Sequence, residues 1–162
     1  MNDIDADLAT LAVGLRTRGW MLASAESCTG GLIAAACTAL AGSSDWFDRG
    51  VVSYSNEAKT ELLGVPAELI AQHGAVSSEV VRAMADGMLA RSKAQLTVAV
   101  TGIAGPGGGS PAKPVGTVWV AIASRDRPAA AKLLQLQGDR DAIRRQTVAW
   151  ALHALRDAVA NR

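Results

Sequence analysis

A short apolar segment that passes through a tight turn into an alanine-rich segment is the feature that most constrains the fold. The run from Trp20 to Ala25 has the length and composition of a buried strand, and Leu32–Ala41 has those of a helix. The six residues between them, Glu26 to Gly31, are mostly small or turn-forming. A strand that leads through such a turn into a helix is typical of α/β proteins, in which helices cover the faces of a sheet.

The same alternation continues along the chain. Further strands are expected at Gly50–Ser55, Leu96–Val100, Gly116–Ala123 and Ala131–Leu136, and helices at Asp3–Gly19, Asn56–Leu63, Pro66–His73, Ser78–Ser92 and Asp141–Ala160. The connection Ser124–Pro128 is too short for a crossover helix, so the last two strands should be antiparallel. We therefore expect a three-layer α/β/α sandwich around a mixed, mostly parallel sheet of about five strands. Residues 1–162 are expected to form it as a single domain.

Composition and charge exclude several classes of protein. The chain has 162 residues, of which 49% are hydrophobic, enough for one well-filled core. Its 16 basic and 15 acidic residues leave a formal charge of +1, so no nucleic-acid-binding surface is indicated. The chain starts with acidic residues where a signal peptide needs a basic region, and no apolar run approaches the ~20 residues of a membrane span. We expect a cytoplasmic protein with no membrane or nucleic-acid partner, and leave open whether its copies form a homo-oligomer.

The cysteines and histidines indicate no metal site. Cys28 and Cys37 lack CxxC spacing and have no His or Cys neighbours at the intervals of zinc ligands. His73 and His153 are isolated, and single histidines are usually structural. We therefore expect neither a metal nor a disulfide.

Ser27 lies in the turn between the first strand and the helix that follows it. Backbone N–H groups at such a turn are unpaired and lie at the positive end of the helix dipole. Ser27 could therefore attack a carbonyl while the amides of Thr29 and Gly30 stabilise the oxyanion. The alternative is an ordinary helix cap. Cys28 is a rival nucleophile, but adjacent residues at a strand end face opposite ways, so only one of the two can point into a site.

Tyr54 and Lys59 follow the second predicted strand. A lysine near a serine can serve as its base if burial keeps the amine neutral, and a tyrosine hydroxyl can relay or hold the proton. Such a set needs no histidine. The alternative is a solvated helix lysine and a structural strand tyrosine.

A glycine-rich segment, Thr101–Ser110, separates two predicted strands. Bare backbone at Gly102, Gly105 and Gly107 could contact a phosphate or a sugar. The segment is neither a Walker loop nor the GxGxxG of dinucleotide-binding proteins, and a flexible turn is an equally good interpretation.

Three arginines stand at the start of the last predicted helix. The four-residue spacing puts Arg140 and Arg144 on one face, with Arg145 beside them. Guanidinium groups near amide donors suit a phosphate monoester. The alternative is a salt-bridge cluster with Asp139 and Asp141.

Taken together, these segments resemble the C-terminal domain of the CinA (competence/damage-inducible protein A) family, in particular its stand-alone nicotinamide mononucleotide amidohydrolases. The resemblance extends from about Leu8 to Val159. It rests on the blocks AESCTGG (Ala25–Gly31), AGSSDWFDRG (Ala41–Gly50), YSNEAK (Tyr54–Lys59), QHGAVS (Gln72–Ser77), TGIAGPGGGS (Thr101–Ser110), KPVGTVW (Lys113–Trp119) and GDRDAIRRQ (Gly138–Gln146).

The resemblance implies a reaction and a catalytic set. The reaction is hydrolysis of the carboxamide of nicotinamide mononucleotide to nicotinic acid mononucleotide and ammonia, within pyridine nucleotide salvage and without a metal or organic cofactor. The family's catalytic serine, tyrosine and lysine correspond to Ser27, Tyr54 and Lys59. Two alternatives are a non-catalytic pyridine-nucleotide-binding or competence-related interaction module, and an NAD-dependent reductase, which the absence of GxGxxG disfavours.

Overall fold

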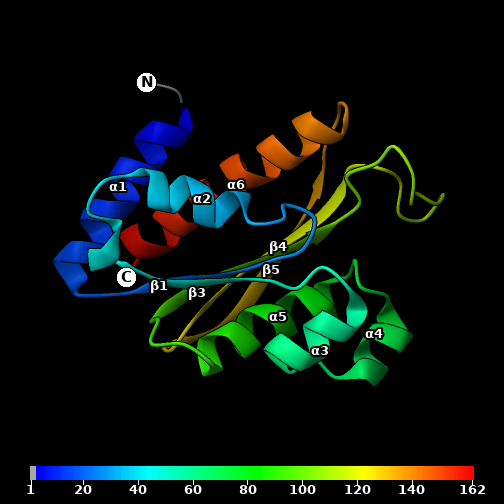
Figure 1. The fold of residues 1–162 in the computed structure, drawn as a ribbon, viewed down its shortest axis with the longest axis horizontal. Helices are drawn as coiled ribbons and strands as arrows, with labels where there is room; N and C mark the ends of the chain where they lie inside the picture. The colour runs from blue at the N-terminus through cyan, green and yellow to red at the C-terminus, as the bar shows by residue number, and fades with distance from the viewer. Residues whose placement is uncertain (1–2) are drawn as a thin grey trace.

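The computed structural model describes residues 3–162, which form three layers, with the sheet between two layers of helices (Figure 1). The strands are β1 (Leu22–Glu26), β2 (Phe47–Val52), β3 (Leu96–Gly102), β4 (Thr117–Ser124) and β5 (Arg127–Gln135). The helices are α1 (Asp3–Arg18), α2 (Leu32–Ala39), α3 (Asn56–Leu63), α4 (Ala67–His73), α5 (Ser78–Ala90) and α6 (Arg140–Ala160), with a short 3₁₀ turn η1 (Ser43–Asp45). No helix within the described residues combines the length and the apolar character that a bilayer crossing requires.

The sheet has the strand order β2-β1-β3-β4-β5. β1 pairs in parallel with both β2 and β3, whereas β3–β4 and β4–β5 are antiparallel pairs, so β4 runs against the other four strands. The predicted mixed sheet and the antiparallel final pair are confirmed. Glu26, the last residue of β1, is level with Val52 of β2 and Val100 of β3. The loops that follow these three strands therefore meet at one edge of the sheet, where open α/β sheets bind ligands.

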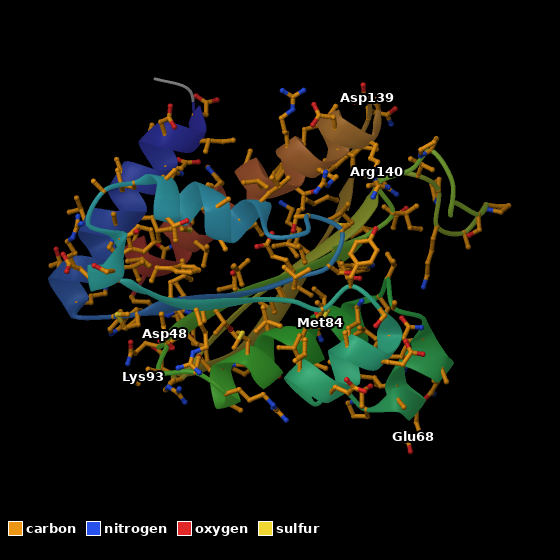
Figure 2. All side chains as sticks on the ribbon, viewed as in Figure 1. Asp48, Glu68, Met84, Lys93, Asp139 and Arg140 are labelled. Carbon is orange, nitrogen blue, oxygen red and sulfur yellow. The ribbon has the colours of Figure 1, made fainter. Side chains whose placement is uncertain are left out.

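Apolar side chains from both faces of the sheet form two cores. One core lies under α1, α2 and α6, and the other lies under α3, α4 and α5 (Figure 1). Alternation along β3 explains the division, since Val98 and Val100 face the first core and Ala99 faces the second. Met84 of α5 is fully buried against the second face (Figure 2). The central strands β1 and β3 are therefore buried on both sides.

The largest differences between the observed and the predicted strand boundaries belong to the two edge strands. β2 begins at Phe47 rather than Gly50, and β5 begins at Arg127 rather than Ala131. Ser124 pairs with Arg127 across a two-residue turn, so the segment taken for a connection is already strand. Pro128 is tolerated there because an edge strand leaves one side of its backbone without ladder hydrogen bonds.

Candidate active site

The loops that follow β1, β2 and β3 enclose a pocket of about 180 Å³, which the start of α6 completes. Its lining consists of Ser27, Cys28, Tyr54, Asn56, Lys59, Ala75, Val76, Thr101, Gly102, Ala104 and Arg140. The pocket thus brings together the predicted serine, lysine and tyrosine. A larger hollow of about 390 Å³ lies between α3 and α4, but its lining residues include no serine or cysteine beside a lysine or histidine.

Lys59 and Ser27 are in direct contact within this pocket. The Nζ atom of Lys59 lies 3.1 Å from Ser27 Oγ, and it lies 3.0 Å from each of the carbonyl oxygens of Ser53 and Tyr54. A neutral amine has two N–H groups and one lone pair, so the two carbonyls can accept both hydrogens. The lone pair then faces Ser27 Oγ, as a base for that hydroxyl requires.

Burial favours the neutral form of Lys59. Only 1% of this side chain is exposed, and desolvation of the charged form lowers the pKa of the amine below its ordinary value. The local fold sets this position. Ser55 caps α3 by accepting a hydrogen bond from the Ala58 amide, so Lys59 lies in the first turn of α3. Side chains in a helix lean towards its N-terminus, and here that direction leads to the end of β1.

Glu26 holds the turn that carries Ser27. This residue is 1% exposed, and its carboxylate accepts hydrogen bonds from the Thr29 hydroxyl and from the amides of Gly31, Ile33 and Ala34. The first amides of α2 are therefore already occupied and cannot bind an oxyanion. Glu26 was not among the predicted site residues, although an acidic residue just before a helix start is the signal for such a cap.

The candidate oxyanion donors differ in part from those predicted. The Gly30 amide donates to the Ser27 carbonyl at 3.0 Å, so it is not free. Within residues 3–162, the amides of Cys28 and Thr29 donate to no other residue. The geometry therefore keeps Thr29 as a candidate donor and replaces Gly30 by Cys28. The side chain of Cys28 is a poor nucleophile, because burial raises the pKa of its thiol to about 11.

Tyr54 contacts Lys59 through its backbone carbonyl and not through its hydroxyl. Its carbonyl accepts from Lys59, whereas its hydroxyl accepts a hydrogen bond of 3.3 Å from Arg140 Nη2. The side chain is 60% exposed and stands at the mouth of the pocket. The expected contact between the tyrosine hydroxyl and the amine is therefore absent from the described chain.

Arg140 joins the mouth of the pocket to the glycine-rich loop between β3 and β4. Its Nη1 donates to the Gly105 carbonyl at 2.7 Å, and Figure 2 shows it at the start of α6, beside that loop. Gly102 lines the pocket, and a Cβ there would lie 2.6 Å from Val118 Cγ2, so no larger residue fits. Gly105 has a φ of +81°, which favours glycine. Gly107, in the described chain, does not line the pocket.

The three arginines at the start of α6 do not form the single cluster predicted. Arg140 reaches the pocket mouth, whereas Arg144 donates to the carbonyls of Cys28 and Thr29 behind the serine turn. Arg145 is exposed and pairs with Asp141 one turn earlier at 2.7 Å. Residues 140 and 144 share a helix face and residue 145 does not, which explains why only the first two approach the site.

The buried cap predicts a large loss of stability for Glu26→Gln. An amide presents an NH₂ group where one carboxylate oxygen now accepts, so at least one donor loses its partner, at ~1–3 kcal/mol each. We expect the free energy of unfolding to fall by ~2–4 kcal/mol in urea titrations. Glu68→Gln is the control, since Glu68 is exposed at the first turn of α4 (Figure 2), and it should change stability by less than ~1 kcal/mol. Equal effects of the two substitutions would contradict the role of Glu26.

Comparison with known proteins identifies close relatives across the whole site. The model of the CinA C-terminal domain family matches residues 6–159. A nicotinamide-nucleotide amidohydrolase PncC of Enterobacter agglomerans is 51% identical over 152 residues, covering 93% of either chain. A protein of the same name from Pseudomonas putida is 52% identical over 155 residues, covering 96% of each. The crystal structure of competence/damage inducible protein CihA from Agrobacterium tumefaciens superposes with a TM-score of 0.95 at 45% identity, over 99% of this chain and 97% of that one.

Proposed function

The chain belongs to the CinA C-terminal domain family, and on that basis we propose that it is a nicotinamide-nucleotide amidohydrolase. It would convert nicotinamide mononucleotide to nicotinic acid mononucleotide and ammonia, within pyridine nucleotide salvage in the cytoplasm. The relatives from E. agglomerans and P. putida, which bear this name and match nearly the full chain, support the reaction. The observation that carries it is the buried amine of Lys59, 3.1 Å from Ser27 Oγ in a pocket.

The first half of the reaction forms an acyl-enzyme. Ser27 Oγ attacks the carboxamide carbon while Lys59 Nζ takes the hydroxyl proton. The carbonyl oxygen becomes an oxyanion, and the amides of Cys28 and Thr29 are the candidate donors to it. The carbonyls of Ser53 and Tyr54 stabilise the ammonium that Lys59 has become.

The second half releases both products. The Lys59 ammonium returns its proton to the nitrogen of the tetrahedral intermediate, the C–N bond breaks and ammonia leaves. Water then attacks the ester carbon, Lys59 takes a proton from that water, and the Ser27 oxygen leaves with a proton as the carboxylic acid forms. Lys59 thus begins and ends the cycle neutral.

The size of the pocket indicates which part of the substrate it holds. At about 180 Å³ it is smaller than the ~300–1,000 Å³ of sites that enclose a whole drug-sized ligand. We assign it to the pyridine carboxamide, so that the ribose and phosphate lie at the mouth. Arg140 and the backbone of the loop around Gly102 and Gly105 lie at this mouth and are the candidate groups to bind the ribose and phosphate.

Measuring ammonia release from nicotinamide mononucleotide tests this function. The competing interpretation is a non-catalytic module that binds pyridine nucleotides, which would not require a buried neutral lysine against a serine hydroxyl. We expect stoichiometric ammonia and nicotinic acid mononucleotide from the purified protein. Binding of the mononucleotide, measured by calorimetry, without any ammonia would contradict the amidohydrolase and support the binding module.

The same assignment predicts a substrate order of mononucleotide, then nucleoside, then free nicotinamide. Losing a charge-assisted contact costs ~1.5–3 kcal/mol, so kcat/KM for the nucleoside should fall by roughly tenfold to a hundredfold. Arg140→Gln should lower kcat/KM for the mononucleotide and narrow this gap. Equal turnover of mononucleotide and nucleoside by the unmodified protein would show that no group at the mouth binds phosphate.

A further inference from the structure

Arg144 holds the serine turn from the side of α6. Its Nε donates to the Cys28 carbonyl at 3.0 Å, and its Nη2 donates to the Thr29 carbonyl at 3.2 Å. Gly30 makes room for this contact, because a Cβ at that position would lie 3.2 Å from Arg144 Nη2. Within the described chain Arg144 does not line the pocket, whereas Arg140, one turn earlier on the same helix face, does.

The contact fixes the direction of a backbone amide. In a trans peptide the C=O and N–H bonds point in opposite directions. The Cys28 carbonyl, which belongs to the same peptide unit as the Thr29 amide, points at Arg144, so the Thr29 N–H points away from Arg144. The peptide unit between Ser27 and Cys28 is held in the same manner. The Gly30 amide donates to the Ser27 carbonyl at 3.0 Å, and this contact fixes the direction of the Cys28 N–H bond. The Thr29 hydroxyl also donates a hydrogen bond to Glu26, which restrains the same residue.

We infer, on the basis of the proposed amidohydrolase function, that Arg144 is a positioning residue for the oxyanion and not a ligand of the substrate's phosphate. The guanidinium aims the Cys28–Thr29 peptide, and its positive charge polarises that peptide so that the Thr29 N–H becomes a stronger donor. α6 then carries two arginines with separate tasks. Arg140 meets the substrate at the mouth, and Arg144 acts through the backbone beside the nucleophile.

Steady-state kinetics of Arg144→Gln with two substrates separates the two roles. If Arg144 aims an oxyanion donor, kcat should fall by ~100-fold with little change in KM, since one donor of this kind contributes ~10²–10³ in rate. The same loss should appear with the nucleoside, which has no phosphate, at raised enzyme concentration. Arg144→Lys should recover part of kcat, because an ammonium keeps the charge and can bind one of the two carbonyls.

Arg140→Gln serves as the matched comparison. In this variant kcat/KM should fall more for the mononucleotide than for the nucleoside. If Arg144→Gln instead raises KM for the mononucleotide and leaves nucleoside turnover unchanged, Arg144 binds the phosphate and the inference is overturned. Thermal unfolding checks that each variant folds, and should Arg144→Gln not fold, Arg144→Lys decides by a reduced kcat at unchanged KM. Failure of the unmodified protein to release ammonia would refute the proposed function itself. Full kcat in the Arg144 variants would instead refute only the role of Arg144, so the two failures are distinguishable.

Discussion

Replacing Ser27 with alanine should reduce kcat by ~10⁴-fold or more, which is the scale for removal of a serine nucleophile. Without Oγ there is no atom to form the acyl-enzyme, and Lys59 loses the hydroxyl that lies 3.1 Å from its amine. Cys28→Ala should retain most of the activity. Burial raises the pKa of the Cys28 thiol to about 11, so the side chain is protonated near neutral pH, and alanine preserves the backbone amide.

Ammonia release by the two variants, measured beside the unmodified protein, checks this pair of expectations. Binding of the mononucleotide should persist in Ser27→Ala, because the pocket walls and Arg140 are untouched. Mass spectrometry of the unmodified protein, quenched during turnover, should find the acyl group on the peptide that contains Ser27. Similar losses in both variants, or loss confined to the cysteine variant, would overturn the assignment of the nucleophile.

The layered fold could be predicted from the sequence because the central strands are buried on both faces and consist mostly of apolar and small residues. β3, at Leu96–Gly102, contributes to both cores, and its apolar run is unmistakable. The edge strands β2 and β5 were harder to delimit. Asp48 and Arg49 are charged residues near the start of β2, and Pro128 lies near the start of β5, because an edge strand is partly exposed to solvent. Their polar ends resemble loops.

The meeting of Ser27 and Lys59 was also predictable, since both follow parallel strands that end at the same edge. The remaining contacts depend on backbone directions that residue types do not encode. Lys59 is held by carbonyls rather than by the Tyr54 hydroxyl. Gly30, at a φ of +58°, turns the chain so that its amide closes on Ser27. Helical spacing placed Arg140 and Arg144 on one face of the helix. It could not show that Arg140 reaches the mouth of the pocket whereas Arg144 reaches the turn that carries Ser27.

Lys59→Arg should abolish nearly all turnover, by ~10³-fold or more, while the variant still binds the mononucleotide. Arginine keeps the positive charge but cannot lose its proton at any usable pH, so it has no lone pair to offer the Ser27 hydroxyl. In the unmodified protein, burial lowers the pKa of Lys59, so kcat/KM should rise with pH through that lowered pKa and then level off. Substantial activity of Lys59→Arg, with the rising limb intact, would mean that another group is the base.

Stability provides a second test of Lys59 that does not depend on activity. Because the pKa of Lys59 is lower in the folded chain than its ordinary value of ~10.4 in the unfolded chain, the unfolded state binds more protons between those two values. The free energy of unfolding contributed by this residue should therefore rise with pH across that window. Lys59→Met has no proton to bind, so its stability relative to the unmodified protein should be greatest below the lowered pKa and should decline as pH increases. Urea titrations of both proteins over a pH series measure this difference, and a difference that stays constant with pH would show that Lys59 remains charged in the folded protein and cannot serve as the base.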